Sequence, residues 1–256
     1  HNNVPNWLTT DVVANNWTSA QIHAFATSYI RAVMAATQGV VYEWDVANEM
    51  ISDSQVTGQI DYRTADNTGT IPAWYSGVAD PQAFIDACFI AARQADPTVR
   101  LYYNDYGIRY TGTPYRKTAD MMAIVSDMVA RGIPIDGVGL QAHIRGMNHD
   151  GTTNQPVDFL TKLEDTFKAL DALCLDCSLT ELDIRLETDN PAAEGNVTAA
   201  QLAHQQGLYE QVVGLALSQP NCPAVLTWGF TDAESWVPGF FPGVVPAVVT
   251  HRRYGA

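Results

Sequence analysis

The chain has 256 residues, of which 46% are hydrophobic and 16% are charged, so it contains enough apolar material for one large globular core. A formal net charge of −14 disfavours nucleic acid or an anionic membrane as a partner, because phosphates would be repelled. No stretch approaches the roughly 18 consecutive apolar residues of a membrane span. We therefore expect a monomeric globular protein with a neutral ligand, and no nucleic-acid or membrane partner.

Helices and strands are predicted to alternate along the chain. Apolar residues recur at helical spacing from Thr18 until Gly39, and the buried strand VVYEWDVANEM follows at 40–50. A second helix begins at Asp80-Pro81 and precedes the strand VRLYYNDYG at 99–107. Each strand therefore follows a helix that ends at a recognisable stop signal.

The same order is predicted three more times. The helices lie near 118–131, 160–170 and 198–217, and the strands that follow read GVGLQAHI from 137, SLTELDI from 178 and AVLTWGF from 224. Five helix–strand units without hairpin signals indicate a parallel sheet with right-handed crossovers.

Polar or aromatic side chains end every one of these strands. In a doubly wound sheet the functional ends gather at one switch point, whereas in a (β/α)8 barrel each successive strand contributes to the site. The pattern therefore favours a (β/α)8 TIM barrel. The strand-end residues are Asn48 and Glu49, Asn104 and Asp105, Gln141 and His143, Glu181 and Asp183, then Trp228 and Asp232.

Two strand-end glutamates, Glu49 and Glu181, match the needs of glycosidic bond cleavage, which takes a proton donor and a carboxylate facing the sugar carbon. Alternate strand residues share a face, so Glu181 and Asp183 should point the same way, as should Gln141 and His143. His143 would then lie between two carboxylates. Its bond to Glu181 would keep that group ionised and oriented, while Asp183 holds the other ring nitrogen.

Six segments in order resemble the motifs of glycoside hydrolase family 10, the retaining endo-1,4-β-xylanases. They are HNNVPNW at 1–7, WDVANE at 44–49, YYNDYG at 102–107, GLQAH at 139–143, LTELDI at 179–184, and TWGFTD with the following SW at 227–236. Each segment alone is weak, but the ordered set is specific.

The resemblance implies endo-acting hydrolysis of xylan or xylo-oligosaccharides by double displacement, with carboxyl groups about 5 to 5.5 Å apart. Glu49 would be the general acid/base and Glu181 the nucleophile. Asn48 would bond the sugar 2-hydroxyl, with Asp183 behind His143. The other implied substrate-binding residues are His1, Gln141 and His143 in the subsite, Trp228 and Trp236 as its walls, and Tyr106 on the aglycone side.

The sequence also departs from the family pattern. The family's barrel begins with two βα units ahead of the His1 motif, so we expect residues 1–256 to be a single catalytic barrel domain that is incomplete at its N-terminus. Gly107 stands where the family has Asn, and Asn3 replaces its Gln. After Gly243 the tail no longer matches.

Four cysteines and two sequons bear on the compartment. Cys174-x-x-Cys177 has no second close pair to complete a zinc site, and we expect it to stabilise a loop. Cys222 lacks the family's usual partner, since that position is Ala216. With the sequons at 16–18 and 196–198, the composition favours a secreted, extracellular protein that contains a disulfide. Neither a cofactor nor a metal is expected, and Asp61, Asp66 and Asn67 lack the spacing of a calcium loop.

Three alternatives to a strict xylanase remain open. One is a mixed or cellulase-like β-1,4-glycanase, because discrimination against a C6 hydroxymethyl depends on glycone contacts that cannot be assigned. Another is a carbohydrate-binding barrel without turnover. The third is a metal-dependent hydrolase, whose ligands would be His1, His143, Glu181 and Asp183.

Overall fold

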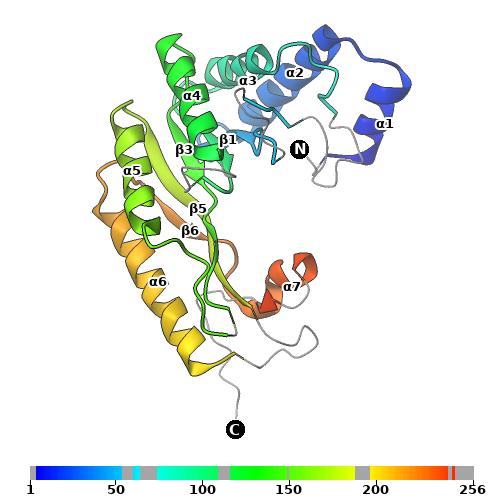
Figure 1. Ribbon diagram of the computed structural model, residues 1–256. Helices are drawn as coiled ribbons and strands as arrows, with labels where there is room; N and C mark the ends of the chain where they lie inside the picture. The colour runs from blue at the N-terminus through cyan, green and yellow to red at the C-terminus, as the bar shows by residue number, and fades with distance from the viewer. Residues whose placement is uncertain are drawn as a thin grey trace. The chain divides into compact units, whose positions relative to one another are not determined.

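The computed structural model describes residues 4–53, 60–63, 74–108, 116–148, 150–187, 197–241 and 244–245 (Figure 1). The chain divides into two compact units, and each is described separately below. The first unit comprises His1–Asp105, Thr111–Gly139 and Leu173–Leu175, and the second comprises Tyr106–Tyr110, Leu140–Ala172 and Asp176–Ala256. His1 and Asn3 lie outside the described residues, as do Asp66, Asn67 and the sequon asparagine Asn196.

The first unit contains a parallel sheet and its helices. Strand β1 pairs with β2, so that Glu43 lies opposite Arg100 and Asn48 opposite Asn104, and β2 is followed in the sheet by β3. Because the two strands are parallel, their carboxyl ends lie at the same edge. The elements are α1 (Asn6–Ala14), α2 (Ser19–Thr37), β1 (Glu43–Asn48), α3 (Pro81–Ala95), β2 (Arg100–Asp105), α4 (Lys117–Ala130) and β3 (Gly137–Leu140).

Local signals set the ends of these helices. Thr18 forms a capping box at the start of α2, because its hydroxyl accepts from the Gln21 amide at 3.3 Å and Gln21 Oε1 accepts from the Thr18 amide at 2.8 Å. Asp80 caps α3 through the amide of Ala83 at 3.0 Å. The predicted helices over these segments are confirmed. Helix α1 was not predicted, and the motif at 1–7 overlaps only its first two residues, Asn6 and Trp7.

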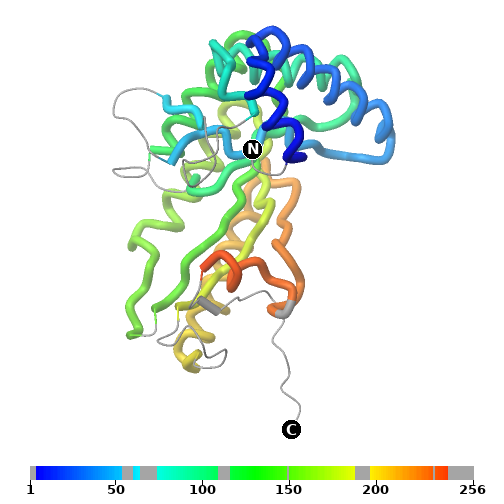
Figure 2. Tube along the Cα trace, turned by 90° about the vertical axis from the view of Figure 1, so that its right-hand side faces the viewer, coloured from blue at the N-terminus to red at the C-terminus, as the bar shows by residue number. Residues whose placement is uncertain are grey.

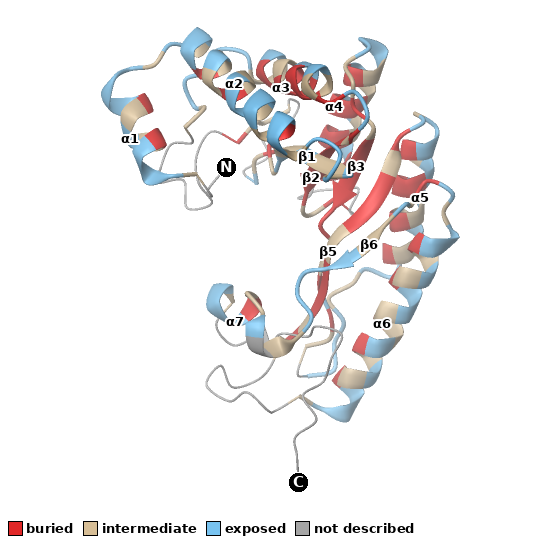
Figure 3. Cartoon of the chain, turned by 180° about the vertical axis from the view of Figure 1, so that it is seen from behind, coloured by how far each residue is buried: buried red, intermediate tan, exposed pale blue. Residues whose placement is uncertain are grey.

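The interior of the first unit is apolar. Leu8, Ile22, Ala26, Phe84 and Cys88 form a buried cluster that joins α1, α2 and α3. Beside this cluster lies a cavity of about 660 Å³, whose walls are mainly aromatic and aliphatic side chains from the same helices and from β1. Buried residues are coloured red in Figure 3, where they continue along β2 and β3.

The second unit is built on one long strand, β5. It pairs in parallel with β4, where His143 lies opposite Asp183, and with β6, where Leu179 lies opposite Val225. It also pairs antiparallel with β7. Figure 2 shows the tube of β5 beside those of β4 and β6. The elements are β4 (His143–Arg145), α5 (Phe159–Asp171), β5 (Asp176–Glu187), α6 (Ala199–Ser218), β6 (Val225–Thr227), the 3₁₀ turn η1 (Asp232–Glu234), α7 (Val237–Phe240) and β7 (Val244–Val245).

The predicted strand GVGLQAHI is not one strand. It separates into β3 and β4 at Ala142, which has a φ of 59°. A left-handed residue cannot continue a pleated strand, and this conformation is rare for a residue other than glycine. We predicted that Gln141 and His143 share a face because we took them as alternate residues of one strand. No single strand contains both residues, so this reasoning was wrong.

Two further predictions concerned membrane spans and cysteines. Among the described helices, none is long and apolar enough to cross a membrane. Cys88, Cys174, Cys177 and Cys222 are all thiols in the structure, so the expected disulfide is not among its contacts.

Candidate active site

The second unit holds a histidine between two carboxylates. His143 Nδ1 lies 2.9 Å from Asp183 Oδ2, and His143 Nε2 lies 3.2 Å from Glu181 Oε2. Glu181 and Asp183 are alternate residues on β5, so their side chains project from the same face of the sheet, where both contact the side chain of His143 from the neighbouring strand β4. The predicted arrangement of these three residues is confirmed.

The protonation of His143 follows from these contacts. Burial opposes a charge on the ring, but the bonds to Asp183 and Glu181 and their negative charges outweigh it and raise the pKa of His143 to about 9. The imidazole is therefore positively charged near neutral pH. A positive charge therefore lies within hydrogen-bond distance of both carboxyl groups.

Trp236 completes this cluster. Its indole Nε1 donates to Asp183 Oδ2 at 2.8 Å, and its ring centroid lies 4.8 Å from that of His143. Asp183 is 1% exposed, so its position depends on these buried contacts. The sequence predicted Trp236 as an aromatic wall, and its bond to Asp183 was not foreseen, because the two residues are 53 positions apart.

The remaining predicted residues of the second unit differ in exposure. Gln141 is buried at 2%, and Tyr106 is half-buried. Trp228 is 48% exposed, and its backbone amide donates to the carbonyl of Leu182 on β5 at 3.2 Å. Trp228 therefore presents a large part of its ring outward, beside the strand that carries Glu181.

In the first unit, Glu49 follows directly after β1. Its backbone has a φ of 53°, and its amide donates to the carbonyl of Asn104 at 2.8 Å. Asn104 also donates from Nδ2 to Asn48 Oδ1 at 3.1 Å, and Asn104 is almost fully buried. The end of β2 therefore orients both residues of the pair Asn48–Glu49. Since Glu49 and Glu181 belong to different units, their predicted separation stays a prediction.

A polar network beside Glu49, buried except at Asp53, was not predicted from the sequence. Arg63 donates from Nε to the carbonyl oxygen of Glu49 at 2.9 Å. Lys117 Nζ lies 3.0 Å from Asp53 and 3.1 Å from Asp105. Burial raises the pKa of Asp105 to about 6, although the neighbouring Lys117 lowers it. No sequence motif pointed to Arg63, Asp53 or Lys117.

Within the described ranges, no group of three or more His, Cys, Asp or Glu side chains could hold a metal ion. His1, one of the ligands of the metal-dependent alternative, lies outside those ranges.

Comparison with known proteins identifies the family. The model of "Glycosyl hydrolase family 10" matches residues 1–252. The chain belongs to this family. Its fold class is therefore the (β/α)8 barrel, as predicted, and the alternation of helices with parallel strands agrees with it.

Curated relatives and solved structures agree. Endo-1,4-beta-xylanase A of Fusarium oxysporum f. sp. lycopersici is 33% identical over 99% of this chain and 69% of that protein. Endo-1,4-beta-xylanase B of Thermotoga neapolitana is 30% identical over 99% of this chain, which covers 63% of the relative. The chain thus spans roughly two thirds of the length of these relatives.

Among solved structures, the family 10 xylanase from Bispora sp. MEY-1 with xylobiose superposes with a TM-score of 0.81 at 26% identity, over 99% of this chain and 68% of that one. Native xylanase 10B from Thermotoga maritima gives a TM-score of 0.76 at 29% identity, over 97% of this chain and 65% of that one.

Proposed function

We propose that the protein containing this chain hydrolyses internal β-1,4-xylosidic bonds of xylan with retention of the anomeric configuration. The observation that carries the proposal is the cluster in which His143 lies between Glu181 and Asp183. The hydrogen bond from His143 orients the Glu181 carboxyl group, and a nucleophile must be held in a fixed orientation towards the anomeric carbon. Membership of family 10 supports the same assignment.

In this mechanism Glu181 attacks the anomeric carbon and forms a covalent glycosyl intermediate. Glu49 first gives its proton to the departing oxygen, and then takes a proton from the water that hydrolyses the intermediate. Asn48 bonds the sugar 2-hydroxyl. Gln141, His143 and His1 line the subsite, Trp228 and Trp236 form its walls, and Tyr106 supports the aglycone side.

Three further inferences accompany the proposal. Residues 1–256 belong to a single catalytic domain, which is supported by one family match that extends across both compact units. The substrates are xylan and xylo-oligosaccharides, since the Bispora relative was solved with xylobiose. The protein acts outside the cell as a monomer, where a polymeric substrate is accessible.

The test combines product analysis with stereochemistry. Purified protein is incubated with xylan, xylohexaose and a β-1,4-glucan, and new reducing ends are quantified. The anomer released first is read by proton NMR. We expect internal cleavage of xylan with a β-anomer as first product. Release of the α-anomer would overturn the retaining mechanism, equal rates on the glucan would favour the mixed glycanase, and binding without cleavage would favour the binding barrel.

A further inference from the structure

The backbone of Glu49 adopts a conformation that needs support. Its φ of 53° lies in the left-handed region, which residues other than glycine, asparagine and aspartate seldom occupy. Such a conformation is strained, and it persists only when neighbouring groups hold it. The turn decides where the Glu49 carboxyl points, because the direction of the Cβ atom is set by the backbone.

Two hydrogen bonds clamp this turn from opposite sides. The Glu49 amide donates to Asn104 O at 2.8 Å, and the Glu49 carbonyl accepts from Arg63 Nε at 2.9 Å. The first bond continues the pairing of β1 with β2. The second bond comes from a side chain 14 positions away in the sequence, and it is not part of the strand pairing of β1.

A short antiparallel bridge brings Arg63 to this place. Ile51 pairs with Tyr62, the Arg63 amide donates to Met50 O at 2.8 Å, and the Ser52 amide donates to Asp61 O at 2.7 Å. Residues 60–63 thus lie against the segment that follows Glu49. The side chain of Arg63 is only 4% exposed, so its guanidinium is fixed within the unit.

The guanidinium makes several contacts at once. While Nε bonds Glu49 O, Nη2 donates to Ile51 O at 3.3 Å and pairs with Asp53 Oδ2 at 3.2 Å. Asp53 is in turn 3.0 Å from Lys117 Nζ. A planar fork can meet these partners simultaneously, whereas a lysine ammonium on a flexible stem cannot reproduce the same geometry.

We propose that Arg63 is a positioning residue for the general acid/base, acting through the carbonyl of Glu49 to aim its carboxyl at the glycosidic oxygen. This inference depends on the proposed role of Glu49. A proton donor must lie within hydrogen-bond reach of its acceptor, and a displacement of about 1 Å can lower the rate on the order of 100-fold.

The experiment compares leaving groups. The unmodified protein and its Arg63→Lys variant are assayed on dinitrophenyl β-xylobioside, on phenyl β-xylobioside and on xylan. Since the dinitrophenolate departs without protonation, we expect kcat/KM, which reports formation of the glycosyl intermediate, to fall about 10- to 100-fold on the phenyl glycoside and xylan, but only a few-fold on the dinitrophenyl glycoside. The alkaline limb of the pH dependence of kcat/KM should also move.

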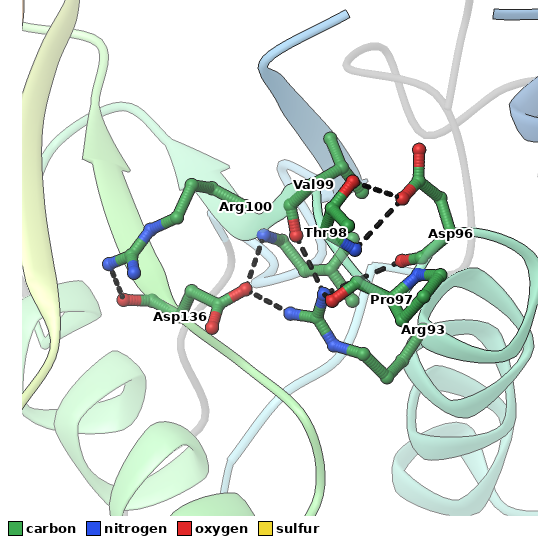
Figure 4. Close-up of polar contacts among 8 residues, drawn as sticks. Arg93, Asp96, Pro97, Thr98, Val99, Arg100 and Asp136 are labelled. Carbon is green, nitrogen blue, oxygen red and sulfur yellow. Dashed lines mark hydrogen bonds and ion pairs between the residues drawn. The ribbon is translucent and has the colours of Figure 1, made fainter. Parts of the chain in front are cut away.

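Arg93→Lys is the matched control. Arg93 also holds backbone carbonyls in the first unit, bonding Pro97 O at 3.1 Å and Val99 O at 2.7 Å and pairing with Asp136 (Figure 4). The carbonyls that Arg93 holds precede the start of β2. Asn104 and Glu49 lie at the other end, at the carboxyl ends of the paired strands. Arg93→Lys should lower Tm, and any change of kcat/KM should be the same for all leaving groups.

Two further variants separate the possible outcomes. If Glu49→Gln itself fails to distinguish the leaving groups, the acid/base assignment is wrong. If Glu49→Gln distinguishes them but Arg63→Lys lowers all three rates equally, the inference about Arg63 is overturned alone. Should Arg63→Lys not fold, Asp53→Asn loosens the guanidinium while retaining Arg63. Asp53→Asn should show the same selective loss, and an equal loss on all substrates would overturn the inference.

Discussion

Glu181 and Glu49 should respond differently to removal of their carboxyl groups. Glu181→Ala should abolish turnover on every glycoside, because no covalent intermediate can form. Glu49→Ala should spare substrates with good leaving groups, since these depart without a proton. Single-turnover kinetics on dinitrophenyl and phenyl β-xylobiosides would check this. Equal loss on both glycosides in Glu49→Ala would contradict the assignment.

His143 makes the stability of the protein depend on pH. Its folded pKa of about 9 lies above the ordinary value of 6.5, so its contribution is complete below about pH 6.5 and disappears as the pH rises through about 9. The Tm difference between the unmodified protein and His143→Gln should therefore be largest near pH 6 and should shrink towards pH 10. Differential scanning calorimetry measures both Tm values across this pH range. A Tm difference that does not change with pH would refute the prediction.

The alternation of side chains along a strand predicted the position of some site residues but not of others. Strand alternation placed Glu181 and Asp183 on one face, and the structure agrees because β5 continues unbroken past both residues. It failed for Gln141 and His143, since Ala142 interrupts the strand. A left-handed alanine has no distinct sequence signature, so only the packed structure reveals it.

At the scale of elements, the ends of helices were the most predictable feature. The α6 helix begins with a capping box in which Thr198 Oγ1 accepts from the Gln201 amide at 3.1 Å and Gln201 Oε1 accepts from the Thr198 amide at 3.0 Å. Such pairs act within four residues, so the sequence contains all the information they need.

Removing this cap should affect stability alone. Thr198→Ala is expected to lower the free energy of unfolding by about 1 kcal/mol, because an amide at the helix start loses its acceptor. Chemical denaturation would measure the loss, and Thr198→Ser, which restores the hydroxyl, is the control. A change of kcat larger than two-fold in the folded Thr198→Ala protein would show that the cap also influences the site.

Strand lengths were less predictable than helix ends. The segment AVLTWGF was expected as a strand, yet β6 covers only Val225–Thr227. Trp228 and the residues after it leave the sheet, although the Trp228 amide still donates to Leu182 O. Pairing with β5 decides where β6 ends, and pairing is a property of two segments far apart in the chain.

At the scale of the whole molecule, the net charge of −14 has a consequence for substrates. Association with a neutral polysaccharide should be insensitive to ionic strength, whereas an acidic, glucuronate-bearing xylan is repelled. We expect kcat/KM on the acidic xylan to rise a few-fold between 20 and 300 mM NaCl, with little change on linear xylan that carries no glucuronate. Equal salt responses on both polymers would rule out this electrostatic effect.

The sequence by itself determined the family, the alternation of helices with parallel strands, and the His143–Glu181–Asp183 cluster. These follow from short-range spacing and from motifs that are readable in order. Only the tertiary structure decided that Ala142 breaks a strand, that Trp236 bonds Asp183, and that Arg63 supports Glu49. The physical reason is that the Trp236–Asp183 and Arg63–Glu49 bonds join residues that are far apart in the sequence. The strand break at Ala142 depends on the surrounding packing, which local propensity does not encode.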